Sequence, residues 1–205
     1  MNSSSFQISS RTVLVADASV VINLNATGRA IDIIRAQPGS VVVIDHTFAE
    51  LAKGAQKGYK DAEKLQALID YGAVRLVRLG EAGNRIYESL VEGSAQHTLD
   101  DGEAATVGYA HEIGGVALID ERKAQNICKT KFPNLVVAFT IDLLLHNTVL
   151  EALGQQGQID AIVSALRDAR MRVPQHQVSM VIEMIGEEVA ATCSSLPKID
   201  PMTRK

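Results

Sequence analysis

Short apolar runs rich in β-branched residues recur along the chain, and helical spacing follows each one. The runs cover residues 13–16, 41–44, 73–79, 116–119 and 135–138. Runs this short have the length of buried strands and are too short for helices. Strands that alternate with helices form right-handed crossovers and a parallel sheet that is covered on both faces. The sequence therefore predicts an α/β fold of three layers, with a mostly parallel sheet between two layers of helices.

Helical spacing of apolar residues places the elements between the strands. Helices are expected from about Thr47 and over 19–36 (with a break near Gly28), 61–71, 84–92, 98–111 and 122–129. The first four residues of 98–111 have the form of a capping box. From residue 140 onward the pattern is helical only, with breaks expected at Gly154, Gly157 and Pro174. We predict a flexible leader (1–11), an α/β domain (12–152), a helical extension packed on it (153–190) and a flexible tail (191–205).

The composition is that of a protein with a packed core. Hydrophobic residues make up 46% and charged residues 21% of the 205 residues, enough to bury a sizeable interior. No apolar run approaches the roughly 20 residues that a membrane helix needs, and the first residues lack the apolar segment of a secretion signal. Cys128 and Cys193 are far apart and match no metal-binding spacing. They are expected to be reduced thiols in a cytoplasmic protein without a membrane partner.

Charge and aromatic content disfavour two classes of nucleic-acid binder. Aromatic residues make up only 4% of the chain, tryptophan is absent, and the net charge is −4. A reader that stacks bases on an aromatic platform needs more aromatic residues, and a broad DNA-coating surface needs a positive net charge. The five histidines form no close metal-ligand spacing. Local basic patches remain compatible with this composition.

Four acidic residues stand where predicted strands end or predicted helices begin. They are Asp17, Glu50, Glu103 and Asp120. Because the carboxyl ends of parallel strands meet at one edge of a sheet, these side chains are expected to converge there. Two carboxylates about 4 Å apart repel by roughly 4 kcal/mol at an effective dielectric constant near 20, so such a group needs a cation. Oxygen ligands without a histidine or cysteine cluster favour Mg²⁺ or Mn²⁺ over zinc.

Most of these acids also have a structural explanation. Thr47-x-x-Glu50 has the form of a capping box, and Asp120 could cap the helix that follows it. Asp17 is the exception, because Ser19 is better placed to cap the next helix. A carboxylate directly after a buried strand is unusual unless it is paired or bound to a metal. The four acids together therefore carry more weight than any one of them.

Four short motifs occur in order along the chain. They are Asp17-Ala-Ser19, Gly102-Glu103, Asp120-Glu121-Arg122, and Thr140 after the last strand. In this order and spacing they resemble the PIN domain, a metal-dependent ribonuclease fold, and the likeness runs from about residue 13 to about residue 186. The resemblance is to bacterial and archaeal PIN-like proteins related to toxins of toxin–antitoxin pairs. It implies the same three-layer α/β/α fold, with the helical extension included.

The resemblance implies roles for the acids. The family's first three catalytic acids fall on Asp17, Glu50 and Glu103, of which Asp17 and Glu103 would also bind the metal. The fourth falls either on Asp120, which directly follows the strand, or on Glu121, which occupies the family's position before an arginine. Both alternatives stay open at the level of the sequence.

Four further residues are implied to support the metal. Ser19 and Thr140 would orient carboxylates or waters, and Asp142 would act through a water. Asp101, in the first turn of the helix that carries Glu103, suits the helix dipole and could replace or assist Glu103. Because residues two apart point to different faces of a helix, the two are not expected to bind one ion together.

The activity that the resemblance implies is hydrolysis of an RNA phosphodiester with Mg²⁺ or Mn²⁺, which lowers the pKa of a bound water. Many PIN proteins resemble toxins that a partner protein inhibits by blocking the acidic pocket, and many form homodimers. The implied partners are therefore RNA, an antitoxin-like inhibitor and a second copy of the chain. The alternative function is a PIN-like module that no longer cleaves and serves as an RNA-binding or protein-interaction subunit.

Two pairs of basic residues lie beside the acids in the sequence. Lys53 and Lys57 recur at helical spacing after Glu50, and Arg122 and Lys123 follow the fourth acid. They could hold RNA phosphates next to the acidic pocket, with an affinity that falls as salt rises. The alternative is an ordinary solvated helix face.

Two other classes of α/β enzyme fit less well. Dinucleotide-binding enzymes carry G-x-G-x-x-G after the first strand, and this chain has no such segment there. Phosphatases and dehalogenases with an aspartyl nucleophile usually carry a second Asp two residues after the first, and here that position is Ser19.

Overall fold

The computed structural model describes residues 8–197 of the chain. Its strands are β1 (Val13–Ala16), β2 (Ser40–Ile44), β3 (Val74–Val77), β4 (Val116–Leu118) and β5 (Val136–Ala138). Its helices are α1 (Ala18–Ala26), α2 (Ala30–Ala36), α3 (Asp45–Ala55), α4 (Asp61–Asp70), α5 (Glu81–Val91), α6 (Asp101–Ile113), α7 (Arg122–Lys131), α8 (Thr140–Leu144), α9 (Asn147–Asp168), α10 (Val178–Ile185) and α11 (Glu187–Ala191).

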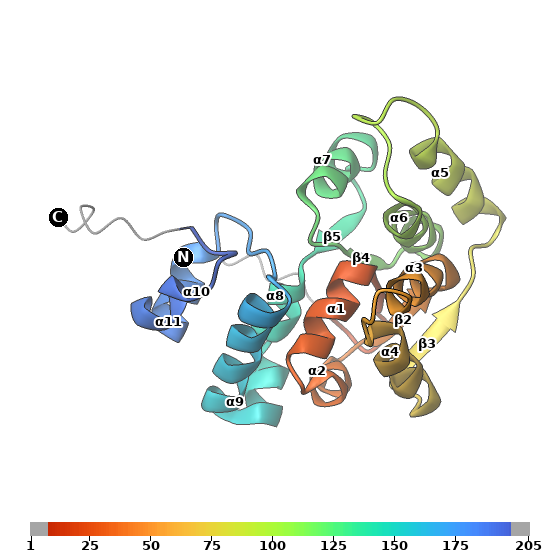
Figure 1. The fold of residues 1–205 in the computed structure, drawn as a ribbon. Coiled ribbons are helices and arrows are strands. Elements are labelled where there is room, and N and C mark those ends of the chain that lie inside the picture. Colours follow the sequence, from red (N-terminus) through yellow and green to blue (C-terminus); the bar gives the residue numbers. More distant parts are fainter. Residues whose placement is uncertain (1–7, 198–205) are drawn as a thin grey trace.

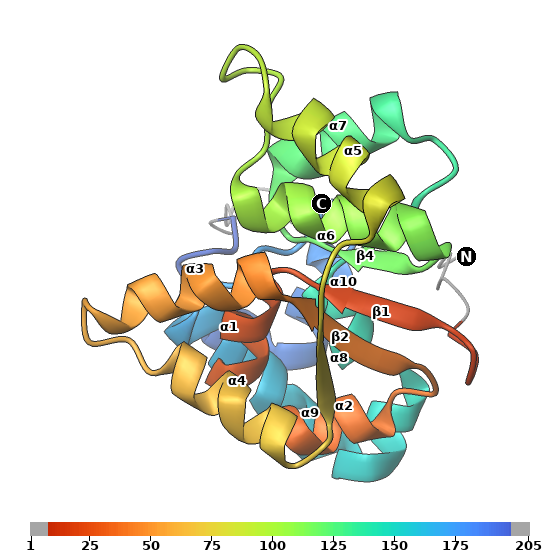
Figure 2. The same cartoon turned by 90° about the vertical axis from the view of Figure 1, so that its right-hand side faces the viewer.

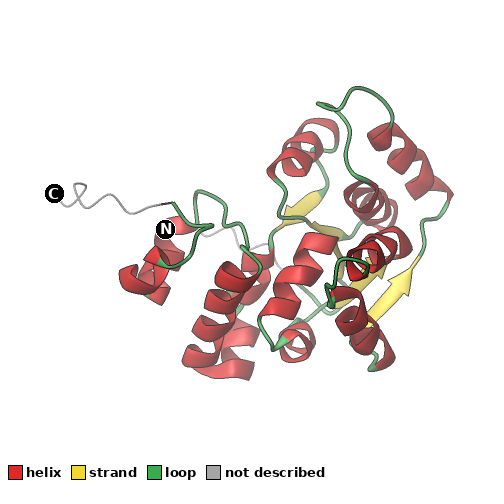
Figure 3. Cartoon of the chain, in the orientation of Figure 1, coloured by secondary structure: helices red, strands yellow, loops and turns green. Residues whose placement is uncertain are grey.

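The strands form one parallel sheet in the order β3-β2-β1-β4-β5, with helices around it (Figure 3). The predicted α/β fold with a covered parallel sheet is confirmed. The chain builds β1, β2 and β3 outward in one direction and then returns to the other side of β1 to add β4 and β5. The direction of winding therefore reverses between β1 and β4, and sheets of this kind bind ligands beyond the carboxyl ends of the two strands at such a reversal.

Successive strand residues point to opposite faces and enter two separate cores. Leu14 and Ala16 pack with the helices α1, α2, α4 and α8–α11, whereas Val15 and Ala117 pack with α5, α6 and α7. Figure 2 shows these two layers of helices on opposite sides of the strands. The three central strands, β1, β2 and β4, are apolar on both faces because helices cover both. The edge strands are partly exposed, at Arg75 and Leu76 in β3 and at Val136 in β5.

The helical extension shares the larger of the two cores. Ile162 of α9 is fully buried in the cluster that contains Leu14 of β1, and α9 contacts α1 and α2 (Figure 1). The boundary expected at residue 152 falls inside α9, whose kink is at Gly154 with φ 70° and ψ 168°. The break expected at Gly157 was wrong, because α9 continues through it. A helical glycine costs only about 1 kcal/mol relative to alanine, and Gln158 and Ile162 are buried beyond it.

The ends of the described chain pack against the protein. Ile8 lies against the larger core, and Cys193 and Leu196 are buried in it. The flexible leader (1–11) and the flexible tail (191–205) stay predictions. The rest of those two segments, residues 1–7 and 198–205, lies outside the described residues. Cys128 and Cys193 are both free and buried. Over residues 8–197, no helix is long and apolar enough to cross a membrane.

Two helices begin at residues other than those expected. β2 runs directly into α3, which starts at Asp45, so Thr47 lies within the helix and is buried. The capping box expected between Thr47 and Glu50 was therefore wrong. The box expected over Thr98–Asp101 was also wrong: the Leu99 amide bonds to Leu90 O at 2.8 Å, which fixes this stretch outside the helix. The capping box at the start of α6 instead joins residues 100 and 103.

Candidate functional site

Two carboxylates lie beyond the carboxyl ends of β1 and β4. Asp17 directly follows β1 and Asp120 lies two residues beyond β4. The two strands end side by side, since Ala16 pairs with Leu118 and the Asp17 amide donates to Leu118 O at 3.2 Å. Sheets of this kind bind ligands where the winding reverses. Local sequence and topology thus bring these two acids to the position where a ligand is expected.

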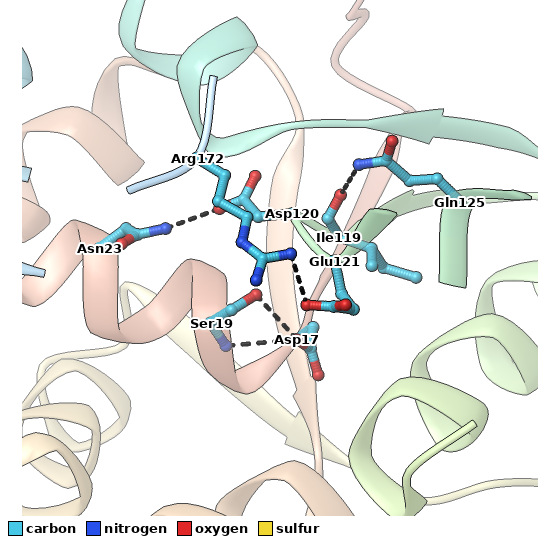
Figure 4. Close-up of polar contacts among 8 residues, drawn as sticks. All are labelled: Asp17, Ser19, Asn23, Ile119, Asp120, Glu121, Gln125 and Arg172. Atoms are coloured by element: carbon cyan, nitrogen blue, oxygen red, sulfur yellow. Dashed lines mark hydrogen bonds and ion pairs between the residues drawn. The ribbon is translucent and has the colours of Figure 1, made fainter. Parts of the chain in front are cut away.

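Asp17 is a buried carboxylate with one unpaired oxygen. It forms the N-cap of α1, a role that the sequence had suggested for Ser19, and its Oδ2 accepts from Ser19 N at 3.2 Å and Ser19 Oγ at 2.9 Å (Figure 4). Its Oδ1 is buried and has no donor among the described residues. Burial raises the pKa of Asp17, while the hydrogen bonds from Ser19 lower it. A buried anionic oxygen without a donor is costly unless a cation reaches it.

Asp120 is held by three donors. Thr140 N and Thr140 Oγ1 donate to it at 2.8 and 2.5 Å, and Asn23 Nδ2 donates at 2.6 Å. Burial raises the pKa of Asp120 to about 6 despite these hydrogen bonds. The residue that caps α7 is Glu121, so the interpretation of Asp120 as a helix cap was wrong. Its surroundings are those of an oriented carboxylate in the interior.

Asn23 is a site residue that the sequence analysis missed. It is buried on α1, and its amide also donates to Thr140 Oγ1 at 3.3 Å. A signal was present, because Asn23 lies four residues after Ser19 and four-residue spacing puts two side chains on the same face of a helix. Asn23 is thus a polar residue on the same helix face as Ser19 of the Asp17-x-Ser19 motif. This spacing predicts that Asn23 belongs to the same site.

Glu50 reaches the site across a glycine. Although Glu50 is exposed along its length, its carboxylate lies against Gly102 in the first turn of α6. A Cβ at Gly102 would collide with Glu50 Oε2 and would stand 3.4 Å from Asp17 Oδ1. Burial raises the pKa of Glu50, and the negative charge of Asp17 raises it further. The absence of a side chain at Gly102 is therefore what lets the two carboxylates approach each other.

Glu103 stands in the first turn of α6. Burial raises the pKa of Glu103 to about 7, and the charge of Asp17 is the second cause. Its Oε2 accepts from Asp100 N at 3.4 Å, a long and weak bond. Asp101 is exposed and accepts from the Tyr87 hydroxyl at 3.1 Å. The helix thus directs Glu103 inward and Asp101 outward.

The chemistry of this group fits a hard divalent cation, although its ligands are not yet gathered around one. The charge of Asp17 raises the pKa values of Glu50, Glu103 and Asp120 alike, so the other three acids each lie within electrostatic reach of Asp17. Within residues 8–197, no three His, Cys, Asp or Glu side chains lie close enough to hold one metal ion. The unpaired Asp17 oxygen and the oxygen-only donor set nevertheless suit Mg²⁺ or Mn²⁺.

Glu121 makes a contact with the helical extension. Arg172, in the segment between α9 and α10, donates from Nη1 to Glu121 Oε2 at 2.9 Å (Figure 4). Gln125 donates to Ile119 O at 2.8 Å and so fixes the turn that carries Asp120 and Glu121. Arg172 was missed because it lies 51 residues from its partner, beyond any local pattern.

Asp142 forms its hydrogen bonds away from the four acids Asp17, Glu50, Glu103 and Asp120. Its Oδ2 accepts from Phe139 N at 2.9 Å, and its Oδ1 accepts from Gln177 Nε2 at 2.7 Å. It therefore caps α8 and ties that helix to the segment before α10. The structure does not bring Asp142 to the four acids.

Two pockets are lined by candidate acids, one by Glu121 and the other by Glu50. The larger, about 670 Å³, is lined by Glu121, Arg122, Lys123 and Arg172 among others; we call it the α7 pocket. The second, about 470 Å³, is lined by Glu50, Lys53, Asp100, Asp101 and others; we call it the α3 pocket. Lys57 lies in the turn after α3 and lines neither of them. Of the four basic residues singled out from the sequence, three thus line a pocket beside the acids.

Comparison with known proteins places the chain in a family. A family model described as "PIN domain" (DUF3368) matches residues 13–187. The chain is also similar to a crystal structure of VapBC2 from Rickettsia felis bound to a DNA fragment from their promoter, with 13% sequence identity and a TM-score of 0.44, over 62% of this chain and 98% of that one. Among curated proteins, none matches the sequence significantly. PIN domains are a family of nucleases that generally use divalent metal ions. Because the family model covers most of the sequence, the chain belongs to the PIN-domain family.

Proposed function

We propose that this protein is a metal-dependent endoribonuclease that hydrolyses RNA phosphodiester bonds. The observation that carries the proposal is the buried Asp17 carboxylate, whose Oδ1 has no donor among the described residues and faces Glu50 across Gly102. Folding a chain around such a group is unfavourable unless a ligand with positive charge compensates it. The membership of a nuclease family supplies the reaction class.

The metal would be held by Asp17, Glu103 and Asp120, with Glu50 completing the catalytic acids and Glu121 as the alternative to Asp120. Bound Mg²⁺ or Mn²⁺ supplies a cation that lowers the pKa of water and screens charge on the phosphate. Ser19 orients Asp17, because it donates twice to Oδ2 and leaves Oδ1, which lies near Gly102, without a donor. The weak contact of Glu103 with Asp100 N leaves that side chain free to turn toward Asp17.

Thr140 and Asn23 keep Asp120 ionised and fixed. Both donate to the carboxylate, and donors to the charged form lower a carboxyl pKa that burial alone would raise. Orientation of a ligand by such hydrogen bonds typically changes metal affinity or activity by about 10–100-fold. Asp101 is exposed, bonds to Tyr87 and lines the α3 pocket, so it would take no part in metal binding.

The test compares Asp17→Asn with Asp45→Asn. Asp45 follows β2 as Asp17 follows β1, but its carboxylate is partly exposed and faces His46 and Arg78. We expect Asp17→Asn to abolish Mn²⁺-dependent cleavage of single-stranded RNA and to weaken Mn²⁺ binding in calorimetry. Its thermal stability without metal should not fall, because the amide removes a buried charge. Asp45→Asn should keep its activity. An Asp17→Asn protein that still cleaves RNA only when Mn²⁺ is added would refute the assignment.

The second candidate function is a PIN-like subunit that binds RNA or protein without cleaving. Two observations favour it: no ready-made ligand set is found within residues 8–197, and Glu121 is occupied by Arg172. The two functions differ in metal binding. If the wild-type protein binds RNA but gives no heat of Mn²⁺ binding in calorimetry, it would be the subunit that binds without cleaving.

The family resemblance further supports a role as the toxin of a toxin–antitoxin pair in the cytoplasm, with an inhibitory partner and a homodimer as its assemblies. Induced expression in a bacterial host tests the toxin role. Growth arrest with the wild-type chain, but not with Asp17→Asn, is expected from a toxin that cleaves RNA. Normal growth in both cultures argues for another cellular role.

A further inference from the structure

The α7 pocket is a basic surface on an acidic protein. Four cations line it, Arg122, Lys123, Lys131 and Arg172, and Glu121, the alternative fourth acid, also lines this pocket. The chain as a whole carries a net charge of −4. Because positive charge is gathered here beside the candidate catalytic acids, the pocket can attract the anion on which those acids would act.

Helix geometry explains the shape of the pocket. Its lining contains two rows of α7 residues with four-residue spacing, one beginning at Arg122 and passing through Asn126 to residue 130, the other running from Lys123 through Ile127 to residue 131. Residues four apart lie one above another on a helix. The two rows therefore run along the axis of α7 for about 13 Å, starting directly after Glu121.

The cations of the α7 pocket are available to a ligand. Within residues 8–197, Arg122, Lys123 and Lys131 take part in no ion pair. Arg172 pairs with Glu121, but the two side chains are 61% and 41% exposed, and solvent screens a pair of this kind. Arg172 can thus exchange Glu121 for another anion at little cost, and a guanidinium suits phosphate particularly well.

The remaining lining suits a base. Ile127 is partly buried against the smaller core, and His97 is an exposed ring whose Nδ1 lies 2.9 Å from Ser94 Oγ. Proteins bind single-stranded RNA by stacking unpaired bases on aromatic or histidine rings while cations hold the backbone. The combination of an apolar wall, a ring and four cations favours a nucleotide over an acidic protein surface, which would need no ring.

We propose that the α7 pocket binds the stretch of single-stranded RNA on one side of the scissile phosphate. The four cations contact its phosphates, and His97 and Ile127 contact a base. The protein would bind the RNA on this one side of the scissile phosphate only. The α3 pocket presents three carboxylates and a single lysine and so repels phosphate. The proposal rests on the proposed nuclease function only for the position of the scissile phosphate.

Binding without cleavage tests the pocket directly. Fluorescence anisotropy of a labelled single-stranded RNA with the full-length protein in EDTA compares two triple variants that remove equal charge. One is Arg122→Gln, Lys123→Gln and Lys131→Gln. The other is Lys60→Gln, Lys64→Gln and Lys129→Gln, three exposed lysines that line neither pocket. We expect the first to bind at least about tenfold more weakly, with a salt dependence shallower by about two, and the second to match the wild type. Circular dichroism verifies that both are folded.

The outcomes separate this proposal from the proposed function. Equal weakening in both triple variants, or wild-type affinity in the first, refutes RNA binding by the α7 pocket. Its cations would then serve to bind an acidic protein partner. RNA that binds through the pocket but is cleaved neither with Mg²⁺ nor with Mn²⁺ refutes the nuclease and leaves RNA binding by the α7 pocket intact. For a cleaving enzyme, substrates shortened from one end should lose cleavage while those shortened from the other end keep it. If shortening the RNA from either end reduces cleavage equally, binding on one side only is refuted.

Discussion

Asn23 Nδ2 donates to Asp120 Oδ2 at 2.6 Å, across 97 residues of sequence. The bond joins the first helix of the fold to the turn after β4, on opposite sides of the point where the sheet reverses its winding. Thr140 is the third member of this group, since it donates to Asp120 and accepts from Asn23. Three elements that are remote in the chain thus fix a single carboxylate.

Replacing Asn23 by alanine should lower activity and should cost about 1–3 kcal/mol of stability, because a buried hydrogen bond is lost. Asp120 keeps its two donors from Thr140 but loses its third, so cleavage should fall by about 10–100-fold. The pKa of Asp120 should rise further above about 6, which shifts the acidic limb of the pH–rate profile to higher pH. The control is Asn25→Ala on the same helix, whose amide bonds to Asp61. A pH profile identical to that of the wild type would count against a role for Asn23 in orienting Asp120.

Replacing Gly102 by alanine should impair function without unfolding the protein. The new Cβ collides with the end of the flexible Glu50 side chain and crowds Asp17 Oδ1, so the carboxylates must separate. Alanine is otherwise favoured over glycine in a helix by about 0.5–1 kcal/mol. We expect an unchanged or slightly higher melting temperature with a clear loss of Mn²⁺ affinity. Gly54→Ala in α3, where the nearest atom would be Tyr59 Cδ2 at 3.6 Å, should raise stability and keep metal binding. Equal metal affinity in both variants would contradict the role of Gly102.

Paired substitutions at positions 120 and 121 should identify the fourth acid. Asp120 is buried and held by three donors, whereas Glu121 is 41% exposed and bound to Arg172. Asp120→Asn should therefore reduce the cleavage rate by about 10²-fold or more. Glu121→Gln should stay within about tenfold, since solvent already screens that charge. The measurement is the single-turnover rate at saturating Mn²⁺. The reverse order of effects would assign the fourth acid to Glu121.

Stability of the metal-free protein should increase as the pH is lowered toward 6. Burial raises the pKa of Glu103 to about 7 and that of Asp120 to about 6, above the ordinary values of 4.5 and 3.8. A carboxyl group with a raised folded pKa binds its proton more tightly when folded, so its stabilising effect is present at low pH and is lost as the pH rises through the folded value. Thermal unfolding in EDTA should thus give a higher melting temperature at about pH 6 than at about pH 8.

Metal should reverse this dependence. Mg²⁺ or Mn²⁺ that binds only the folded protein raises the melting temperature, and protons compete for the same oxygens. The metal-induced shift should be largest at about pH 8 and smaller at about pH 6. Asp17→Asn should show little shift at either pH. A metal-free protein that is less stable at the lower pH would contradict the raised pKa values.

The sequence by itself determined the class of fold and the position of two acids. Short β-branched runs between helical segments are local patterns, and they suffice to predict a covered parallel sheet. Asp17 and Asp120 follow strands, so the edge on which they lie was fixed as soon as the strands were. Boundaries such as the start of α3 at Asp45 were not, because Ile44 passes from strand to helix without a turn signal.

Only the tertiary structure decided which side chains complete the site. Arg172 reaches Glu121, and Glu50 meets Asp17 over Gly102, through the way helices pack on the sheet. Periodicity reports which face of an element is buried, but it carries no information on which distant residue lies opposite. Contacts between remote residues depend on the crossovers and on the packing of whole helices. For that reason the edge on which Asp17 and Asp120 lie could be predicted from the sequence, whereas the contact of Arg172 with Glu121 and the approach of Glu50 to Asp17 over Gly102 could be found only once the chain was folded.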